Sequence, residues 1–460
     1  MNTRKIGTCL TGIVLGLICA ASHATVTEEE FRLLGTTLTP WGTEKAGSPD
    51  GSYPAYAGDA KAPPEFDPRK GVWPDLYPDE KPLFSIDAKN MEQHKDKLME
   101  GQMELMRRYP TYRIDVYPTH RDVWFPDYWI KGALANARNP ECKTSPDGVG
   151  VYGCWNGTPF PIPRNGYEAM WNHALRSNMN AEYVSTGYLV NANGAITLLV
   201  QTLTYNEYPY NNPAITPYEG AGQSYQRVHN LNRLPARDVG GQTMLWYPLQ
   251  VDKMDQRGWS YTPGQRRVRL APEFAYDTPV AQMGGTMFFD EISIFQGRMD
   301  RFAFELKGKQ LMYLPYHNWR MHLVRGDPAQ LLDPHHYKPE MVRHELRRVW
   351  VVEATPYPGV RHMASKKRFY LDEDTWAAIA YEGWDHSNKL FRVMFSNGAI
   401  NYHNGGFLSF ASSMQSYDVS RGQYTALQTQ LYPGSYIRMD VPWWSETELA
   451  PASMTHRGLR

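Results

Sequence analysis

The sequence predicts a mainly β protein of the α+β class, built on an antiparallel sheet that is strongly curved or barrel-like. Two observations lead to this prediction. Glycine and proline contribute 37 and 34 residues, which cut the chain into short elements and exclude a coiled coil. Many short stretches rich in β-branched and aromatic residues are separated by turn signals instead of long helices, which is typical of antiparallel sheets.

The charge balance argues against a nucleic-acid partner. The 48 basic residues offset 48 acidic residues, so the formal net charge is zero. Without a basic surplus, the chain lacks the electrostatic footprint of a nucleic-acid binder. The 14 Trp, 30 Tyr and 16 Phe residues are typical of a folded core and not of a disordered chain.

The first 24 residues have the pattern of a secretory signal peptide. Residues 4–5 are basic, residues 6–21 are uncharged and mostly apolar, and Ser22 and Ala24 are small residues at the positions that signal peptidase reads. We predict cleavage between Ala24 and Thr25 and a periplasmic location. The apolar run is too short to span a bilayer, and no later run of about 20 apolar residues follows, so we expect no transmembrane segment in the mature chain.

The mature chain is expected to have two parts. Residues 25–84 carry many Pro, Gly and Asp residues with little periodicity, so we predict an extended segment that wraps a folded body. Residues 85–460 are predicted to form a single large domain, with a loop insertion at 117–163 and an irregular tail after residue 405.

Two helices are expected in this domain. A stripe of apolar side chains predicts a helix over residues 87–108, which Pro110 ends. Asn165 is a favourable N-cap for a second, shorter helix over residues 165–175.

Strand candidates begin near residue 185. The strongest is a hairpin of residues 188–190 and 196–200 around Asn193-Gly194, because that dipeptide favours the tight turn of an antiparallel hairpin. Further strands are expected at 243–251, 266–270, 286–295, 301–306, 310–314, 345–354, 367–371, 375–381, 389–395 and 399–402.

The mature chain keeps two cysteines, Cys142 and Cys154. In an exported protein, one even pair favours a disulfide, which would contribute about 3 kcal/mol on the loop-entropy model. The alternative is a pair of free buried thiols. The glycine-rich run at 148–153 matches a dinucleotide fingerprint, but no convincing strand precedes it and no helix follows, so we expect a loop and no nucleotide.

No motif in the sequence assigns catalysis. The histidines lack metal-ligand spacing, and the chain has neither a nucleophile elbow nor a P-loop. We therefore predict no enzyme activity, no metal site and no cofactor.

The most informative charged pattern is the strand candidate at 266–270. Arg267 and Arg269 would share one face of this strand, while Arg266, Val268 and Leu270 would share the other. Cations on a sheet face can pair with anionic head groups or with carboxylates of neighbouring strands. The sequence leaves both readings open.

An ordered series of short motifs runs along the mature chain. The motifs are LTPWG at 38–42, EKAG at 44–47, EKPLF at 80–84, YPTHR at 117–121, PFPIP at 159–163, YTPGQRRVR at 261–269, RVWVVEAT at 348–355 and FYLDEDTW at 369–376. This series resembles a known family of exported proteobacterial proteins, the domain of unknown function 1329, often labelled outer-membrane lipoprotein-sorting-like. The resemblance covers nearly all of the mature chain.

The resemblance implies a fold similar to the lipoprotein carriers LolA and LolB, a curved antiparallel half-barrel closed on its concave side by helices. It also implies a periplasmic carrier or chaperone for a hydrophobic, lipid-like molecule, acting with an envelope export system. The expected partners are a permease of the resistance-nodulation-division class and an outer-membrane protein. Two alternatives stay open, a structural adaptor subunit of such a complex and a periplasmic hydrolase of lipid or glycan.

Aromatic side chains are the expected walls of an apolar hollow in such a sheet. Six of them lie in or beside the strand candidates and are predicted to bind the ligand: Trp246, Trp259, Tyr261, Tyr313, Trp350 and Trp376. Because side chains alternate along a strand, only one face of each strand can contribute.

Overall fold

A computed structural model describes residues 26–457, except 65, 72, 215–223, 273, 404, 409–412 and 446. The predicted signal peptide, with its cleavage site at Ala24 and Thr25, lies outside the described residues. Within the described ranges, no helix is both long and apolar enough to cross a bilayer.

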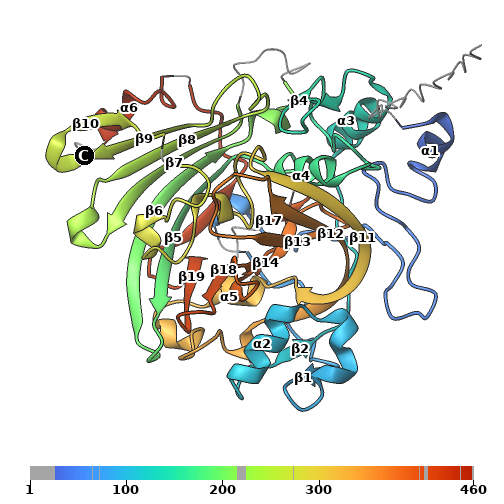
Figure 1. Ribbon diagram of the computed structural model, residues 1–460, viewed down its shortest axis with the longest axis horizontal. Coiled ribbons are helices and arrows are strands. Elements are labelled where there is room, and N and C mark those ends of the chain that lie inside the picture. The colour runs from blue at the N-terminus through green and yellow to red at the C-terminus, as the bar shows by residue number, and fades with distance from the viewer. Residues whose placement is uncertain are drawn as a thin grey trace, which may run out of the picture.

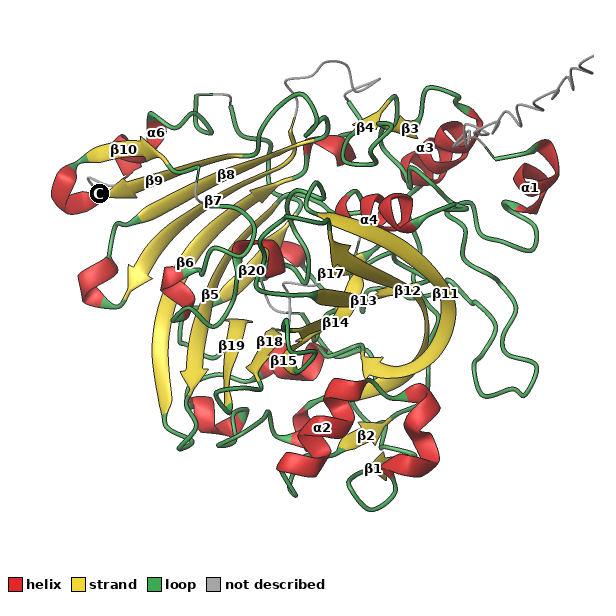
Figure 2. Ribbon diagram, in the orientation of Figure 1, coloured by secondary structure: helices red, strands yellow, loops and turns green. Residues whose placement is uncertain are grey.

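Strands dominate the structure, and helices are few and short (Figures 1 and 2). In the described residues the α-helices are α1 (Glu28–Leu33), α2 (Glu100–Arg108), α3 (Asp127–Arg138), α4 (Gly166–Ala174), α5 (Trp319–Leu323) and α6 (Ser453–Arg457). The strands are β1 (Phe84–Ile86), β2 (Ile114–Val116), β3 (Lys143–Thr144), β4 (Val151–Tyr152), β5 (Ala181–Val190), β6 (Ile196–Glu207), β7 (Ser224–Leu234), β8 (Gln242–Pro248), β9 (Arg257–Thr262), β10 (Arg267–Leu270), β11 (Phe302–Pro315), β12 (Arg343–Pro356), β13 (Lys366–Asp372), β14 (Ala378–Trp384), β15 (Leu390–Ser396), β16 (Ala399–Ile400), β17 (Phe407–Leu408), β18 (Met414–Asp418), β19 (Gln423–Thr429) and β20 (Tyr436–Met439).

One 16-stranded sheet organises the fold. Its order is β1-β2-β12-β13-β14-β15-β18-β19-β5-β6-β7-β8-β9-β10, with β11 on the other side of β12 and β20 beside β5. All pairings are antiparallel except the short contact between β2 and β12. The sheet curves strongly but does not close, because within the described residues β10 and β11 each pair on one side only. The predicted fold class, a curved and open antiparallel sheet, is confirmed.

The tight turn expected at Asn193-Gly194 joins β5 to β6. Gly194 has a φ of +81°, a conformation that glycine adopts without strain. The side chain of Asn191 accepts hydrogen bonds from the backbone N–H groups of Asn193 and Ala195, at 2.9 and 3.0 Å. The meander then continues through β7 to β10, each strand pairing with the one before it.

Helices cover both faces of the β11–β15 part of the sheet. On one face, Phe369 lies opposite Val352 and stacks on Tyr381. Helix α4 covers this face through Tyr167, whose ring packs edge-on against Phe304 beside Phe369. On the other face lies α2, whose Gly101 N–H donates to the buried carboxylate of Glu382 at 2.6 Å. The core of this half therefore lies on both sides of one layer.

The helix expected over residues 87–108 is interrupted. A 3-10 helix ends at Lys97, Leu98 and Met99 are extended, and α2 begins at Glu100. The break brings the backbone of Gly101 against β15, where an added Cβ would lie 2.4 Å from a methyl of Val393. The apolar stripe does not reveal this close approach, so the sequence predicted one continuous helix where the structure has two.

Three further predictions need correction. Residues 286–295 form no strand: they lie across the concave face of the sheet, with positive φ at Ser293 and Ile294. The tail after residue 405 is not irregular, because β18, β19 and β20 join the main sheet. The insertion at 117–163 contains α3 as well as the hairpin β3–β4. That hairpin carries the Cys142–Cys154 disulfide, which is confirmed with an S–S distance of 2.04 Å.

A buried ionic cluster holds the N-terminal segment against the sheet. Arg121 and Arg347 both pair with the carboxylate of Asp374 at 2.8 Å, and all three side chains are buried. Arg121 also donates to backbone carbonyls at positions 44, 46 and 54. The extended segment therefore supplies hydrogen-bond acceptors that a buried guanidinium needs.

His317 lies beside this cluster, between the buried carboxylates of Glu345 and Asp122. Its Nδ1 lies 2.7 Å from Glu345 and its Nε2 lies 3.1 Å from Asp122. Burial opposes the charged form of the imidazole, but the two carboxylates outweigh it and raise the pKa of His317 to about 9. The imidazolium is therefore charged at neutral pH and pairs with both buried carboxylates.

Candidate ligand-binding cavity

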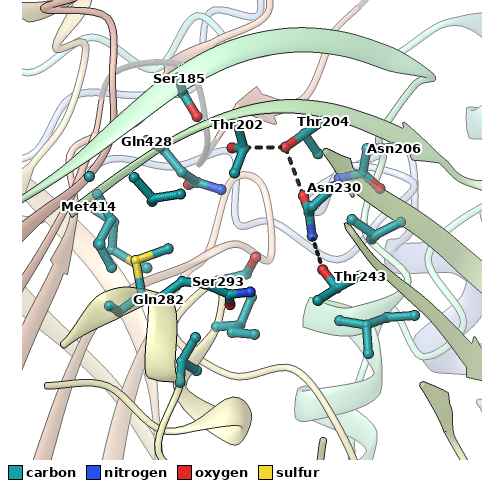
Figure 3. A pocket seen from close by; sticks show the side chains of 18 of the residues that line it. Ser185, Thr202, Thr204, Asn206, Asn230, Thr243, Gln282, Ser293, Met414 and Gln428 are labelled. Atoms are coloured by element: carbon teal, nitrogen blue, oxygen red, sulfur yellow. Dashed lines mark hydrogen bonds between the residues drawn. The ribbon is translucent and has the colours of Figure 1, made fainter. Parts of the chain in front are cut away.

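A cavity of about 130 Å³ lies between the concave face of β5–β8 and the segment 280–296 (Figure 3). Its size is comparable to that of cavities that hold a benzene-sized molecule. Strands β18 and β19 close one side through Met414, Leu427 and Gln428. The cavity is therefore built from three parts of the chain that are distant in sequence.

The sheet side of the cavity is a polar but uncharged surface. Alternate residues of β6, from Val200 through Thr202 and Thr204 to Asn206, point into it. Strand β7 adds Gln226, Val228, Asn230 and Asn232, and β8 adds Thr243, Leu245 and Tyr247. Hydroxyl and amide groups thus replace many of the apolar side chains that usually line a concave sheet face.

Hydrogen bonds connect these groups across the strands. Thr204 Oγ1 donates to Asn230 Oδ1 at 2.8 Å, and Asn230 Nδ2 donates to Thr243 Oγ1 at 3.1 Å (Figure 3). Deeper in the cavity, Gln226 donates to Asn206 at 2.9 Å and accepts from Gln296. The side chains are thereby held in fixed orientations, which presents a ligand with ordered donors and acceptors.

The opposite side is mainly apolar, although Gln282, Ser293 and Gln296 also reach the cavity. The segment 280–296 contributes Val280, Met283, Met287, Phe289 and Ile292. Methionine is flexible and polarizable, so Met283, Met287 and Met414 can adapt to ligands of different shape. The cavity is therefore amphipathic, with one hydrogen-bonding wall and one apolar wall.

Buried ion pairs anchor one end of this covering segment. Asp290 contacts Lys367 and lies 3.0 Å from His362, while Glu291 lies 3.1 Å from Arg392. Burial raises the pKa of Asp290, but the attraction of Lys367 and His362 outweighs it and the pKa is lowered. The anchored end is firmly attached to the sheet, while the turn at residues 281–287 rests on the cavity.

Two further lining residues, Gln428 and Tyr183, add neutral hydrogen-bonding groups to the cavity. Gln428 has a φ of +55° at a register shift of β19, and this local strain points its side chain into the cavity (Figure 3). Beside it, burial raises the pKa of Tyr183 to about 12, so its phenol stays protonated. Both side chains are neutral hydrogen-bonding groups at any physiological pH.

Among the described lining residues there is no Asp, Glu, Lys, Arg, His or Cys. An uncharged lining cannot stabilise a buried charge, and its hydroxyls have no adjacent base to activate them. The arrangement can pack against an apolar group and hydrogen-bond an uncharged polar one. No group of three or more His, Cys, Asp or Glu side chains in the described ranges could hold a metal ion.

The six aromatic residues predicted to bind the ligand do not line this cavity. Trp246, Trp259 and Tyr261 lie on the convex face of β8 and β9, where they pack with Met244 and with Met454 of α6. They point away from the cavity because they alternate with residues such as Leu245 that point into it.

The other three aromatics lie in the β11–β15 half. Trp350 and Trp376 stack with their ring centroids 5.9 Å apart, and Trp376 Nε1 donates to the carbonyl of Trp41 at 3.0 Å. Tyr313 is buried, with its ring edge-on to Phe84. These residues pack the N-terminal segment and the strand β1 onto the sheet.

Sequence reasoning missed the residues that do line the cavity. A period-two pattern of Thr and Asn at 202, 204 and 206, continued by Asn230 and Asn232 in β7, was the available signal. It is weak because polar residues on one face of a strand ordinarily face solvent.

The fold and the site together define a class of protein: an open, curved antiparallel sheet with a small amphipathic cavity on its concave face. The chain belongs to the family described as protein of unknown function (DUF1329), whose family model matches residues 85–455. The resemblance seen in the ordered motifs is thereby confirmed.

The chain is also similar to individual proteins and solved structures. An uncharacterized protein of Pseudomonas aeruginosa is 33% identical over 473 residues, covering all of both chains. The crystal structure of a DUF1329 family protein from Desulfovibrio piger aligns over 62% of this chain and 95% of that one, with a TM-score of 0.42 and 13% identity. A LolA superfamily protein from Nitrosomonas europaea aligns over 63% of this chain and 98% of its own, with a TM-score of 0.37 and 8% identity.

Proposed function

We propose that the protein is a carrier that holds an apolar, lipid-like portion of a small amphipathic molecule in the cavity on the concave face. The observation that carries this proposal is the pairing of a Met-rich apolar wall with an uncharged hydrogen-bonding wall around about 130 Å³ of space. A packed core would fill that space, because protein interiors are close-packed. Because the described lining residues include no Asp, Glu, Lys, Arg, His or Cys, the cavity favours binding over catalysis.

The proposed place of action is the periplasm, in company with a resistance-nodulation-division permease and an outer-membrane protein. The signal-peptide pattern of residues 1–24 supports export. A carrier that shields an apolar group from water would allow such a molecule to pass through an aqueous compartment.

Filling the cavity tests the proposal directly. Gly187 of β5 lines the cavity, and an added Cβ there would meet Val200, Met283 and Leu427 at ordinary contact distances of 3.4–3.6 Å. Gly187→Leu should therefore fold and occupy the space that a ligand needs. Gly264→Leu is the matched control, since its Cβ would lie in open space.

The measurement is the fluorescence of N-phenyl-1-naphthylamine, an uncharged apolar probe, titrated with the mature protein. We expect wild type and Gly264→Leu to bind it and a membrane lipid extract to displace it, while Gly187→Leu loses binding about tenfold or more with a similar urea midpoint. If wild type does not bind the probe and Gly187→Leu unfolds, the space is packed core. The structural adaptor then becomes the better description.

A further inference from the structure

The β9–β10 hairpin concentrates positive charge at a free edge of the sheet. Residues 256–272 include four arginines and no acidic residue. Arg257, Arg266, Arg267 and Arg269 are all exposed, and none forms an ion pair with a carboxylate of the described residues. Of the two readings that the sequence left open for this segment, pairing with carboxylates of neighbouring strands therefore finds no support in the described structure.

Strand register shows which of these arginines face the cavity side. Arg269 lies opposite Ser260, Ser260 lies opposite Thr243, and Thr243 lies opposite Asn230. Directly opposed residues of antiparallel strands point to the same face. Arg269, and Arg267 two residues before it, therefore continue the row of polar groups that begins inside the cavity.

The remaining two arginines lie elsewhere on the hairpin. Arg257 lies opposite Trp246, so it is on the convex face. Arg266 is in the turn, with a φ of +49°. Of the four arginines of this hairpin, Arg267 and Arg269 are therefore the two that share a face with the cavity.

Exposure increases along this row towards the edge of the sheet. Thr204 is buried, Asn230, Thr243 and Ser260 are half-buried, and Arg269 is exposed. Neighbouring strands are about 4.8 Å apart, so the backbone of Arg269 lies roughly 10 Å from that of Thr243 and 14 Å from that of Asn230. A linear molecule could extend from the cavity to the arginines without leaving the concave face.

We propose that Arg267 and Arg269 bind the anionic head group of an amphiphile whose apolar portion occupies the cavity. This inference rests on the proposed function and narrows the ligand to an amphiphile with a phosphate, sulfate or carboxylate group. The uncharged cavity excludes such a group, because burying an unpaired charge is costly. Arginine binds these anions through paired, charge-assisted hydrogen bonds, and the exposed edge leaves the head group partly hydrated.

The test compares dodecyl phosphate with dodecanol as competitors of N-phenyl-1-naphthylamine on the mature protein. For wild type we expect dodecyl phosphate to compete about tenfold more strongly than dodecanol, as charge-assisted hydrogen bonds predict. Arg267→Gln/Arg269→Gln should remove that preference and leave dodecanol unchanged. Arg257→Gln is the matched control, because it removes one charge from the opposite face, and it should keep the preference.

Three outcomes separate the possibilities. Inorganic phosphate alone should not displace the probe; displacement by millimolar phosphate would mark a site for the free anion and overturn the proposal. Equal competition by the two dodecyl compounds on wild type would also overturn the head-group proposal while leaving the cavity function intact. The same holds if Arg257→Gln loses the preference for dodecyl phosphate as fully as Arg267→Gln/Arg269→Gln does. Failure of the probe and of both compounds to bind would instead contradict the proposed function itself.

Discussion

The hydroxyl of Thr204 donates a 2.8 Å hydrogen bond to the side-chain oxygen of Asn230 across the β6–β7 pair, inside the cavity. The amide nitrogen of Asn230 in turn donates a hydrogen bond to the hydroxyl of Thr243 in β8. Three strands of a concave face are thus joined by side chains as well as by backbone. This arrangement makes the polar wall part of the fold and not a set of independent surface groups.

Replacing Asn230 by leucine tests this role. Asn230→Leu has a similar size but leaves Thr204 and Thr243 without their amide partner, so we expect the free energy of unfolding to fall by about 1–2 kcal/mol. Urea unfolding followed by tryptophan fluorescence measures the change. An unchanged midpoint would show that water already satisfies these hydroxyls and that the connection contributes nothing to the fold.

The convex aromatic cluster should matter for stability and not for ligand binding. Met454 of α6 is fully buried against Met244 and Tyr261, and its carbonyl accepts a 2.7 Å hydrogen bond from Gln242. Met454→Ala creates a cavity there, and we expect a loss of about 2 kcal/mol or more in stability. Probe affinity should equal that of wild type, and a parallel loss of binding would indicate that the two faces of β8 are coupled.

The disulfide should be formed in protein taken from the periplasm. Cys142 and Cys154 are separated by 12 residues, and a loop of this length is worth about 3 kcal/mol on the loop-entropy model. Cys142→Ser/Cys154→Ser should therefore lower the free energy of unfolding by about 2–3 kcal/mol. In wild type, alkylation without reductant should modify neither cysteine, and modification of both would contradict the pairing.

The His317 cluster should make stability depend on alkaline pH. The pKa of His317 is about 9 in the folded protein, against an ordinary value of 6.5. A raised histidine pKa stabilises the folded state fully below pH 6.5, and this contribution is lost as the pH rises through 9. We expect a loss on the order of 3 kcal/mol across this window.

The variant His317→Gln separates this effect from other titrations. It should be less stable than wild type at pH 6.5, because Asp122 and Glu345 lose the cation between them. The difference between the two proteins should then shrink towards pH 9.5. Urea midpoints at both pH values supply the comparison, and a difference independent of pH would show that His317 is neutral in the folded state.

The sequence by itself determined those features that depend on neighbours in the chain or on one apolar face. Asn193-Gly194 specifies its hairpin because φ > 0 is needed there, and β12, β13 and β15 are recognisable because buried strands are rich in apolar side chains. The even cysteine pair indicated the disulfide, and the ordered motifs indicated the family. Each of these signals is local, so no knowledge of distant contacts is required.

Only the tertiary structure decided where the cavity lies and what lines it. Strands β7, β18 and β19 are rich in polar residues, and no apolar alternation marks them. Several of these side chains find hydrogen-bond partners on other strands, as Gln226 does with Asn206 and Thr429 with Thr186. Likewise, alternation shows that Leu245 and Trp246 face opposite sides of β8 but cannot tell which side is concave. Curvature and the course of segment 280–296 settle that choice, and both arise from contacts between residues far apart in the chain.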